Sequence, residues 1–97
     1  MIDSIPLNAE TEDLARRTIW FEPPSKALSD PVRFAAYAFA YATFEDMTVL
    51  RRYLSDADLR EALKNAPPGI IDARSWSYWH LRLDVEPVPP LPVRKFG

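Results

Sequence analysis

Hydrophobic residues are most concentrated in residues 30–42, Asp-Pro-Val-Arg-Phe-Ala-Ala-Tyr-Ala-Phe-Ala-Tyr-Ala. Of the last eleven residues in this stretch, only Arg33 is neither apolar nor aromatic. Asp30 can accept a hydrogen bond from a first helical turn, and Pro31 suits the first helical position, where its missing N–H needs no partner. The alanines favour a helix over the strand that the aromatic–alanine alternation suggests. Because this helix is apolar on nearly every side, we expect other elements to surround it.

Four further segments combine helical periodicity with a residue that caps helices. We expect helices over 9–19 after Asn8, 44–54 after Thr43, 56–66 after Ser55 and 73–83 after Asp72. Residues 25–28 are expected to form one additional turn. The prediction is an all-α fold, a single small bundle of four to five short helices around the central apolar helix at 30–42.

The two ends of the chain lack helical periodicity. Residues 1–8 are expected to be a loose N-terminus, and residues 9–84 to form the helical domain. Prolines at 87, 89, 90 and 92 exclude a helix and predict an extended Pro-rich arm over 85–97. Such a stiff arm loses little entropy on binding, so we expect it to contact a partner through Arg94, Lys95 and Phe96. A loose tail, a tail lying across its own domain and an SH3-type ligand are the alternatives.

Composition narrows the class of protein. With 97 residues and 47% hydrophobic content, the chain can form one domain with its own core. A net charge of −2 does not attract nucleic-acid phosphates, and the lack of cysteine excludes disulfides and thiolate metal sites. The N-terminus has no signal-peptide pattern, and the apolar stretch is shorter than the roughly 20 residues that span a bilayer. A cytoplasmic location is therefore expected.

Candidate catalytic groups have simpler structural explanations. Ser77, His80 and Asp84 have triad-like spacing, but three residues along one helix provide no oxyanion hole, so a core or surface histidine is favoured. The acidic pairs, such as Glu45-Asp46, fall in first helical turns, where they offset the helix dipole. The two glycines, at 69 and 97, cannot form a phosphate-binding loop. We predict no catalytic residue, no metal site and no cofactor, and a protein that is not an enzyme.

Basic and aromatic residues suggest binding. Residues 44–66 resemble a helix-turn-helix in outline and carry Arg51 and Arg52, but the second helix begins with acidic residues that repel phosphates. Tryptophan is expected mainly in the core, whereas an exposed tyrosine beside arginine suits a protein interface. The candidate partner-binding residues are Arg51, Arg52, Arg74, Tyr78, Arg94, Lys95 and Phe96.

A family resemblance covers residues 19–92. The chain resembles a small uncharacterised bacterial family of helical proteins that are often encoded beside AbiEii-type nucleotidyltransferase toxins and are regarded as antitoxins or accessory partners. Ala42 stands where such sequences often have glycine. The matching motifs are Ile19-Trp-Phe-Glu-Pro-Pro24, Ala27-Leu-Ser-Asp-Pro31, Arg33-Phe34, Glu45-Asp46, Leu50-Arg-Arg-Tyr-Leu54, Leu59-Arg-Glu-Ala-Leu63, Ala66-Pro-Pro-Gly-Ile70 and Arg74-Ser-Trp-Ser-Tyr-Trp79.

The resemblance implies a role in a toxin–antitoxin system and transfers no catalytic residue. We therefore expect a non-catalytic protein-binding module, the antitoxin-like or accessory partner of a nucleotidyltransferase-type toxin. The alternative is a nucleic-acid-binding transcriptional regulator that uses the helix pair at 44–66. A homodimer is a further expectation, because so many aromatic residues in a small domain can leave an apolar patch uncovered.

Overall fold

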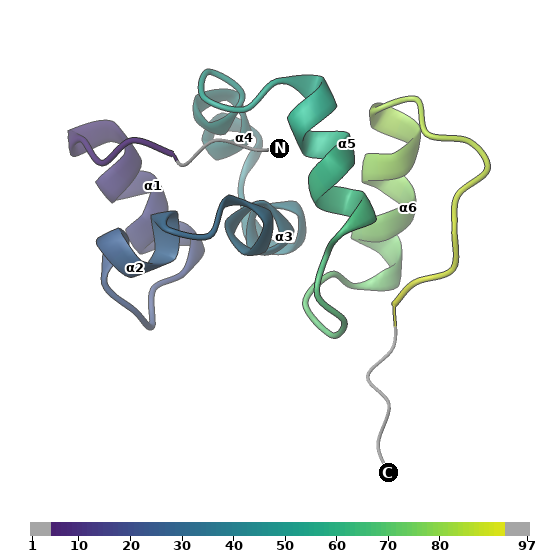
Figure 1. Cartoon of the computed structure of the whole chain (residues 1–97), viewed down its shortest axis with the longest axis horizontal. Coiled ribbons are helices and arrows are strands. Elements are labelled where there is room, and N and C mark those ends of the chain that lie inside the picture. The colour runs from purple at the N-terminus through teal and green to yellow at the C-terminus, as the bar shows by residue number, and fades with distance from the viewer. Residues whose placement is uncertain (1–4, 93–97) are drawn as a thin grey trace, which may run out of the picture.

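The computed structural model describes residues 5–92, and within this range it contains α-helices and no strand (Figure 1). The predicted all-α class is confirmed. The predicted helix at 44–54 ends early, at Leu50, because the N–H groups of Arg52 and Tyr53 bond carbonyls three residues back and tighten the chain into turns. The helices of the described range are α1 (Ala9–Thr18), α2 (Pro24–Leu28), α3 (Pro31–Tyr41), α4 (Phe44–Leu50), α5 (Asp56–Lys64) and α6 (Ala73–Arg82).

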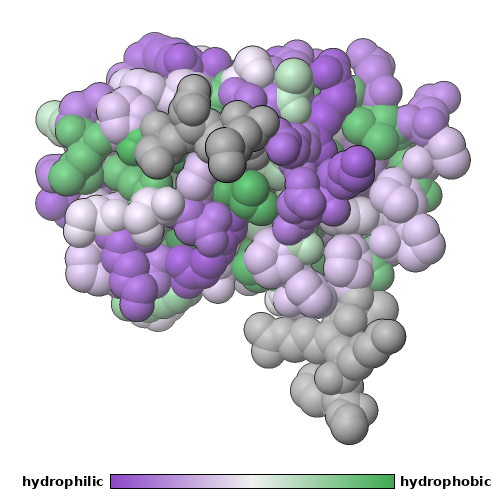
Figure 2. Space-filling view, in the orientation of Figure 1, coloured by the Kyte–Doolittle hydropathy of each residue, from purple (hydrophilic) through white to green (hydrophobic). Residues whose placement is uncertain are grey.

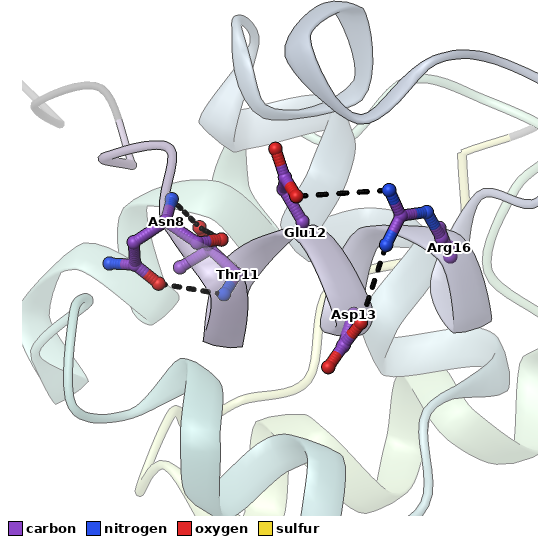
Figure 3. Close-up of polar contacts among 5 residues, drawn as sticks. All are labelled: Asn8, Thr11, Glu12, Asp13 and Arg16. Carbon is purple, nitrogen blue, oxygen red and sulfur yellow. Dashed lines mark hydrogen bonds and ion pairs between the residues drawn. The ribbon is translucent and has the colours of Figure 1, made fainter.

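Every predicted capping residue caps its helix. In each case a side-chain oxygen accepts a hydrogen bond from the backbone N–H three residues later, which satisfies one free donor of the first turn. At α1, Thr11 also accepts from the Asn8 backbone N–H at 2.9 Å, which completes a capping box (Figure 3). The five caps are Asn8, Asp30, Thr43, Ser55 and Asp72.

Helix α3 is the centre of the molecule, as predicted. It lies between α1 and α2 on one side and α5 and α6 on the other (Figure 1), and it contacts all four. Phe34 and Ala36 are fully buried, and the absence of a large side chain at Ala36 lets neighbouring helices approach closely. The expected enclosure of α3 is nevertheless incomplete, because Tyr41 is exposed and Tyr37 only half-buried.

The segment after α6 lies against its own domain. The chain leaves α6 through a left-handed residue, Asp84 (φ 58°), and the Val85 N–H closes the helix end on the His80 carbonyl at 2.8 Å. Trp76 Nε1 then donates to the Pro89 carbonyl at 2.7 Å, which holds the extended segment along α6 (Figure 1). Residues 85–92 therefore match the alternative of a tail lying across its own domain.

Two further observations concern the predicted boundaries. Ile5, in the segment expected to be loose, is buried in the core. In residues 5–92, no helix is long and apolar enough to cross a membrane.

Candidate protein-binding site

The loop after α1 places two aromatic side chains in solvent. Ile19, at the end of α1, is fully buried and anchors the loop, whereas Trp20 is 79% exposed and Phe21 is 51% exposed. Tyr41, at the end of α3, is 67% exposed. Together with the half-buried Tyr37, these side chains form a surface that we call the aromatic face: Trp20, Phe21, Tyr37 and Tyr41.

The four rings of the aromatic face are in contact in series. Trp20 and Phe21 meet edge to face with centroids 5.5 Å apart, Phe21 and Tyr37 lie 5.7 Å apart, and Tyr37 stacks on Tyr41 at 6.2 Å. These are favourable geometries for aromatic pairs. The series therefore forms one continuous surface rather than isolated exposed residues.

An ion pair fixes this surface to α3. The Arg33 guanidinium makes two parallel contacts with the Glu22 carboxylate, at 2.5 and 3.3 Å, and lies over the Tyr37 ring at 5.2 Å from its centroid. The hydrogen bonds from Arg33 hold the pKa of Glu22 below its ordinary value of 4.5. Because Glu22 directly follows Phe21, the bidentate pair limits the movement of the exposed loop.

A pocket of about 380 Å³ opens among the rings, with Arg17 and Thr18 of α1 in its wall. Arg17 donates to the Asp46 carboxylate of α4 at 3.0 Å, and this hydrogen bond raises the pKa of the Arg17 guanidinium. Thr18 is buried, and its Oγ1 has no hydrogen-bond partner among the described residues. A buried hydroxyl without a partner costs free energy, and because the Thr18 Oγ1 atom is shielded from solvent, it lowers the stability of the fold.

A second pocket lies at the corner between α3 and α4, where Phe44 is 79% exposed. We call it the corner pocket; its volume is about 230 Å³. It brings together two of the predicted partner-binding residues, Arg51 from the turn after α4 and Tyr78 from α6. Its wall is formed by Ala42, Phe44, Met47, Thr48, Arg51, Tyr78, Trp79 and Arg82.

The other predicted partner-binding residues lie elsewhere. Arg52 forms an ion pair with Glu10 of α1 at 2.7 Å, and Arg74 is exposed in the first turn of α6, outside both pockets. Arg51 itself pairs with Asp56 at 2.7 Å. Arg94, Lys95 and Phe96 lie outside the described residues.

Two of the residues considered for catalysis make contacts within the fold. His80 is buried, and its Nδ1 lies 2.7 Å from the Trp76 carbonyl. Asp46, expected to serve only the first turn of its helix, is buried and binds Arg17. Across residues 5–92, no group of three or more histidine, cysteine or acidic side chains is arranged to hold a metal ion.

Sequence reasoning missed the exposure of Trp20 and Phe44. Tryptophan was expected mainly in the core, and large aromatic side chains are usually buried. One local signal was present: Trp20 and Phe21 stand between a helix end and the rigid Glu22-Pro23-Pro24, a loop that cannot fold back to bury both rings.

Comparison with known proteins identified no matching family model, no similar curated protein and no similar solved structure. The resemblance of residues 19–92 to the toxin-associated family therefore stays a prediction.

Proposed function

We propose that this chain is a non-catalytic protein-binding module that contacts its partner through the aromatic face and the corner pocket. The observation that supports this most directly is the exposure of Trp20, Phe21, Tyr41 and Phe44, each more than half accessible to solvent. A small domain gains stability by burying such side chains, so leaving four of them exposed removes a large amount of stabilisation. Aromatic residues are enriched in protein interfaces and supply much of their binding energy.

The charged residues at this surface are already positioned. Arg17 is held by Asp46 and Arg33 by Glu22, so neither guanidinium loses much further freedom when a partner binds. Each guanidinium carries five N–H donors, and those not used by the acid can bond partner carbonyls or carboxylates. Preorganised anchors of this kind reduce the entropic cost of association.

The partner to test first is a nucleotidyltransferase-type toxin. The family resemblance stated above is the reason for this choice, and it makes an antitoxin-like or accessory role in the cytoplasm our proposal. In such a role the chain would bind and restrain the toxin without performing chemistry.

The nucleic-acid alternative has less support from the described contacts. Arg51 and Arg52 each form an ion pair with an acid, Asp56 and Glu10, which lowers the positive charge available to phosphates. Figure 2 shows a largely hydrophilic face with scattered hydrophobic patches.

Co-expression tests the proposal. The chain is produced with a nucleotidyltransferase-type toxin of the AbiEii kind and analysed by size-exclusion chromatography, while growth of the host reports toxicity. We expect co-elution and restored growth, and loss of both for Trp20→Ala with Phe44→Ala. Leu81→Ala is the matched control, because Leu81 is an exposed apolar residue outside both pockets. Separate elution with no growth rescue would contradict the proposal.

Light scattering on the isolated chain tests the homodimer. A second copy is a competing occupant of the aromatic face, and a C2 dimer would bury the same residues on both subunits. A concentration-dependent dimer that Trp20→Ala abolishes would support self-association through this surface. A monomer at high concentration would exclude it.

A further inference from the structure

A third cavity is lined by residues of α5, α6 and the proline segment. Helices α5 and α6 lie on the opposite side of α3 from α1 and α2 (Figure 1). We call this cavity the proline groove; its volume is about 450 Å³. Leu63 of α5 and Trp76 of α6 form two apolar walls, and Pro89 and Pro90 form the third. The hydrogen bond from Trp76 Nε1 to the Pro89 carbonyl holds the third wall in place. This volume lies within the range of small-molecule sites.

The charged residues that line the groove are basic. Arg60 and Lys64, one helical turn apart on α5, both line it, and no acidic residue of the described chain does. Arg60 Nε donates to the Leu83 carbonyl at 2.8 Å, which fixes the guanidinium between α5 and the end of α6. The terminal guanidinium nitrogens and the lysine ammonium can then bind an anionic group at the mouth of an apolar cavity.

A buried histidine completes the lining. His80 is 2% exposed, and its Nδ1 lies 2.7 Å from the Trp76 carbonyl oxygen, which can only accept, so Nδ1 carries the proton. In the neutral ring Nε2 is therefore an acceptor, and no described residue donates a hydrogen bond to it. The Trp76 ring packs on the imidazole at 4.2 Å between centroids and holds its orientation.

We propose that the proline groove binds a small molecule that joins a ring-sized apolar body to a carboxylate and a hydroxyl group. The carboxylate lies at Arg60 and Lys64, the hydroxyl donates to His80 Nε2, and the apolar body lies between Trp76 and the prolines. This site is separate from the aromatic face and does not depend on the protein-binding proposal.

Three related compounds separate the contributions of the two polar groups. 3-(4-Hydroxyphenyl)propionate carries both groups, 3-phenylpropionate lacks the hydroxyl, and 3-(4-hydroxyphenyl)propan-1-ol lacks the carboxylate. Each is titrated into the ¹⁵N-labelled full chain, and the tryptophan indole N–H signals are followed by NMR. Trp76 lies in the groove and Trp20 in the aromatic face, so the two signals report on different sites.

We expect the hydroxy acid to shift the Trp76 indole signal saturably, to leave Trp20 unchanged and to bind more tightly than either analogue. Lys64→Gln should weaken the hydroxy acid up to about fivefold, the size expected for one exposed ion pair. The alcohol should bind this variant as it binds the native chain. Lys26→Gln, at an exposed lysine of α2, is the matched control and should change nothing.

Three results would overturn the proposal. One is the lack of a saturable Trp76 shift. Another is equal binding of the hydroxy acid and either analogue. The third is the same loss of affinity for Lys26→Gln as for Lys64→Gln, because a non-specific charge effect would then explain the binding.

Discussion

Trp76 and Trp20 show the same residue type in two opposite settings. Trp76 is 5% exposed, packs on His80 and donates its indole N–H to Pro89, whereas Trp20 is 79% exposed. Helix α3 shows the same contrast between its two sides, with Phe34 buried and Tyr41 in solvent. Buried aromatic residues such as Trp76 and Phe34 stabilise the domain. Exposed ones such as Trp20 and Tyr41 contribute little to stability and are available for binding. We infer that stability and binding are divided between buried and exposed aromatic residues.

The largest expected difference is between alanine substitutions of the two tryptophans. Trp76→Ala should lower the free energy of unfolding by about 3–5 kcal/mol, since it leaves a cavity and removes a hydrogen bond. Trp20→Ala should change it by less than about 0.5 kcal/mol. Urea denaturation followed by circular dichroism measures both. Similar losses for the two variants would show that Trp20 is part of the core.

A smaller effect is expected from enlarging the buried side of α3. Ala36→Leu should cost about 1–3 kcal/mol, because the added atoms have no space against the neighbouring helices. Tyr41→Leu, on the exposed side of α3, is the control and should stay within about 0.5 kcal/mol. Thermal unfolding compares the two. An unchanged melting temperature for Ala36→Leu would mean that this side of α3 is not tightly packed.

The ion pair that supports the aromatic face gives a pH-dependent effect. Glu22→Gln should destabilise the domain by about 1–2 kcal/mol at neutral pH, because Arg33 loses a charged acceptor. The folded pKa of Glu22 lies below its ordinary value of 4.5, so the carboxylate stabilises the fold above that value and loses this effect as the pH falls through the folded pKa. The native chain should therefore lose stability more steeply than Glu22→Gln as the pH falls from about 5 through the folded pKa of Glu22. Parallel curves would contradict this role.

Substitution of Thr18 should raise the free energy of unfolding, in contrast to the changes above. Thr18→Val removes a buried hydroxyl that has no partner in the described structure and should stabilise the free chain by about 1 kcal/mol. Thr48→Val is the control, because the Thr48 hydroxyl is exposed and already donates to the Phe44 carbonyl. A loss of stability for Thr18→Val would show that the hydroxyl is satisfied.

The smallest effect is expected at the end of α6. Asp84 has a positive φ, which glycine adopts more easily, and its charge lies at the negative end of the helix dipole. Asp84→Gly should therefore stabilise the domain by about 0.5 kcal/mol, partly offset by the greater freedom of glycine in the unfolded chain. A loss of stability would indicate that the Asp84 side chain makes a stabilising contact.

Local features of the fold were predictable from the sequence, and tertiary ones were not. The five caps depend on residues three positions apart, so the pattern around Asn8 or Ser55 identifies them directly. The Arg17–Asp46 pair joins residues far apart in the chain, and no local pattern distinguishes Asp46 from other first-turn acids. The residues of the candidate site were harder to predict than the caps. Whether a tryptophan is buried depends on how its loop packs against distant parts of the chain, which no local pattern shows. Arg51 and Tyr78 were predicted separately as partner-binding residues, because each carries a side chain typical of interfaces, and no sequence pattern indicated that they line the same pocket.

This division of roles is tested most directly by the affinity of Trp20→Ala for the proposed toxin partner, measured by calorimetry beside Leu81→Ala. We expect Trp20→Ala to weaken the complex at least about tenfold, as for an aromatic anchor, and Leu81→Ala to bind like the native chain. Both variants should unfold at the native temperature. Native affinity for Trp20→Ala would contradict the account, since the exposed indole would then serve neither the fold nor binding.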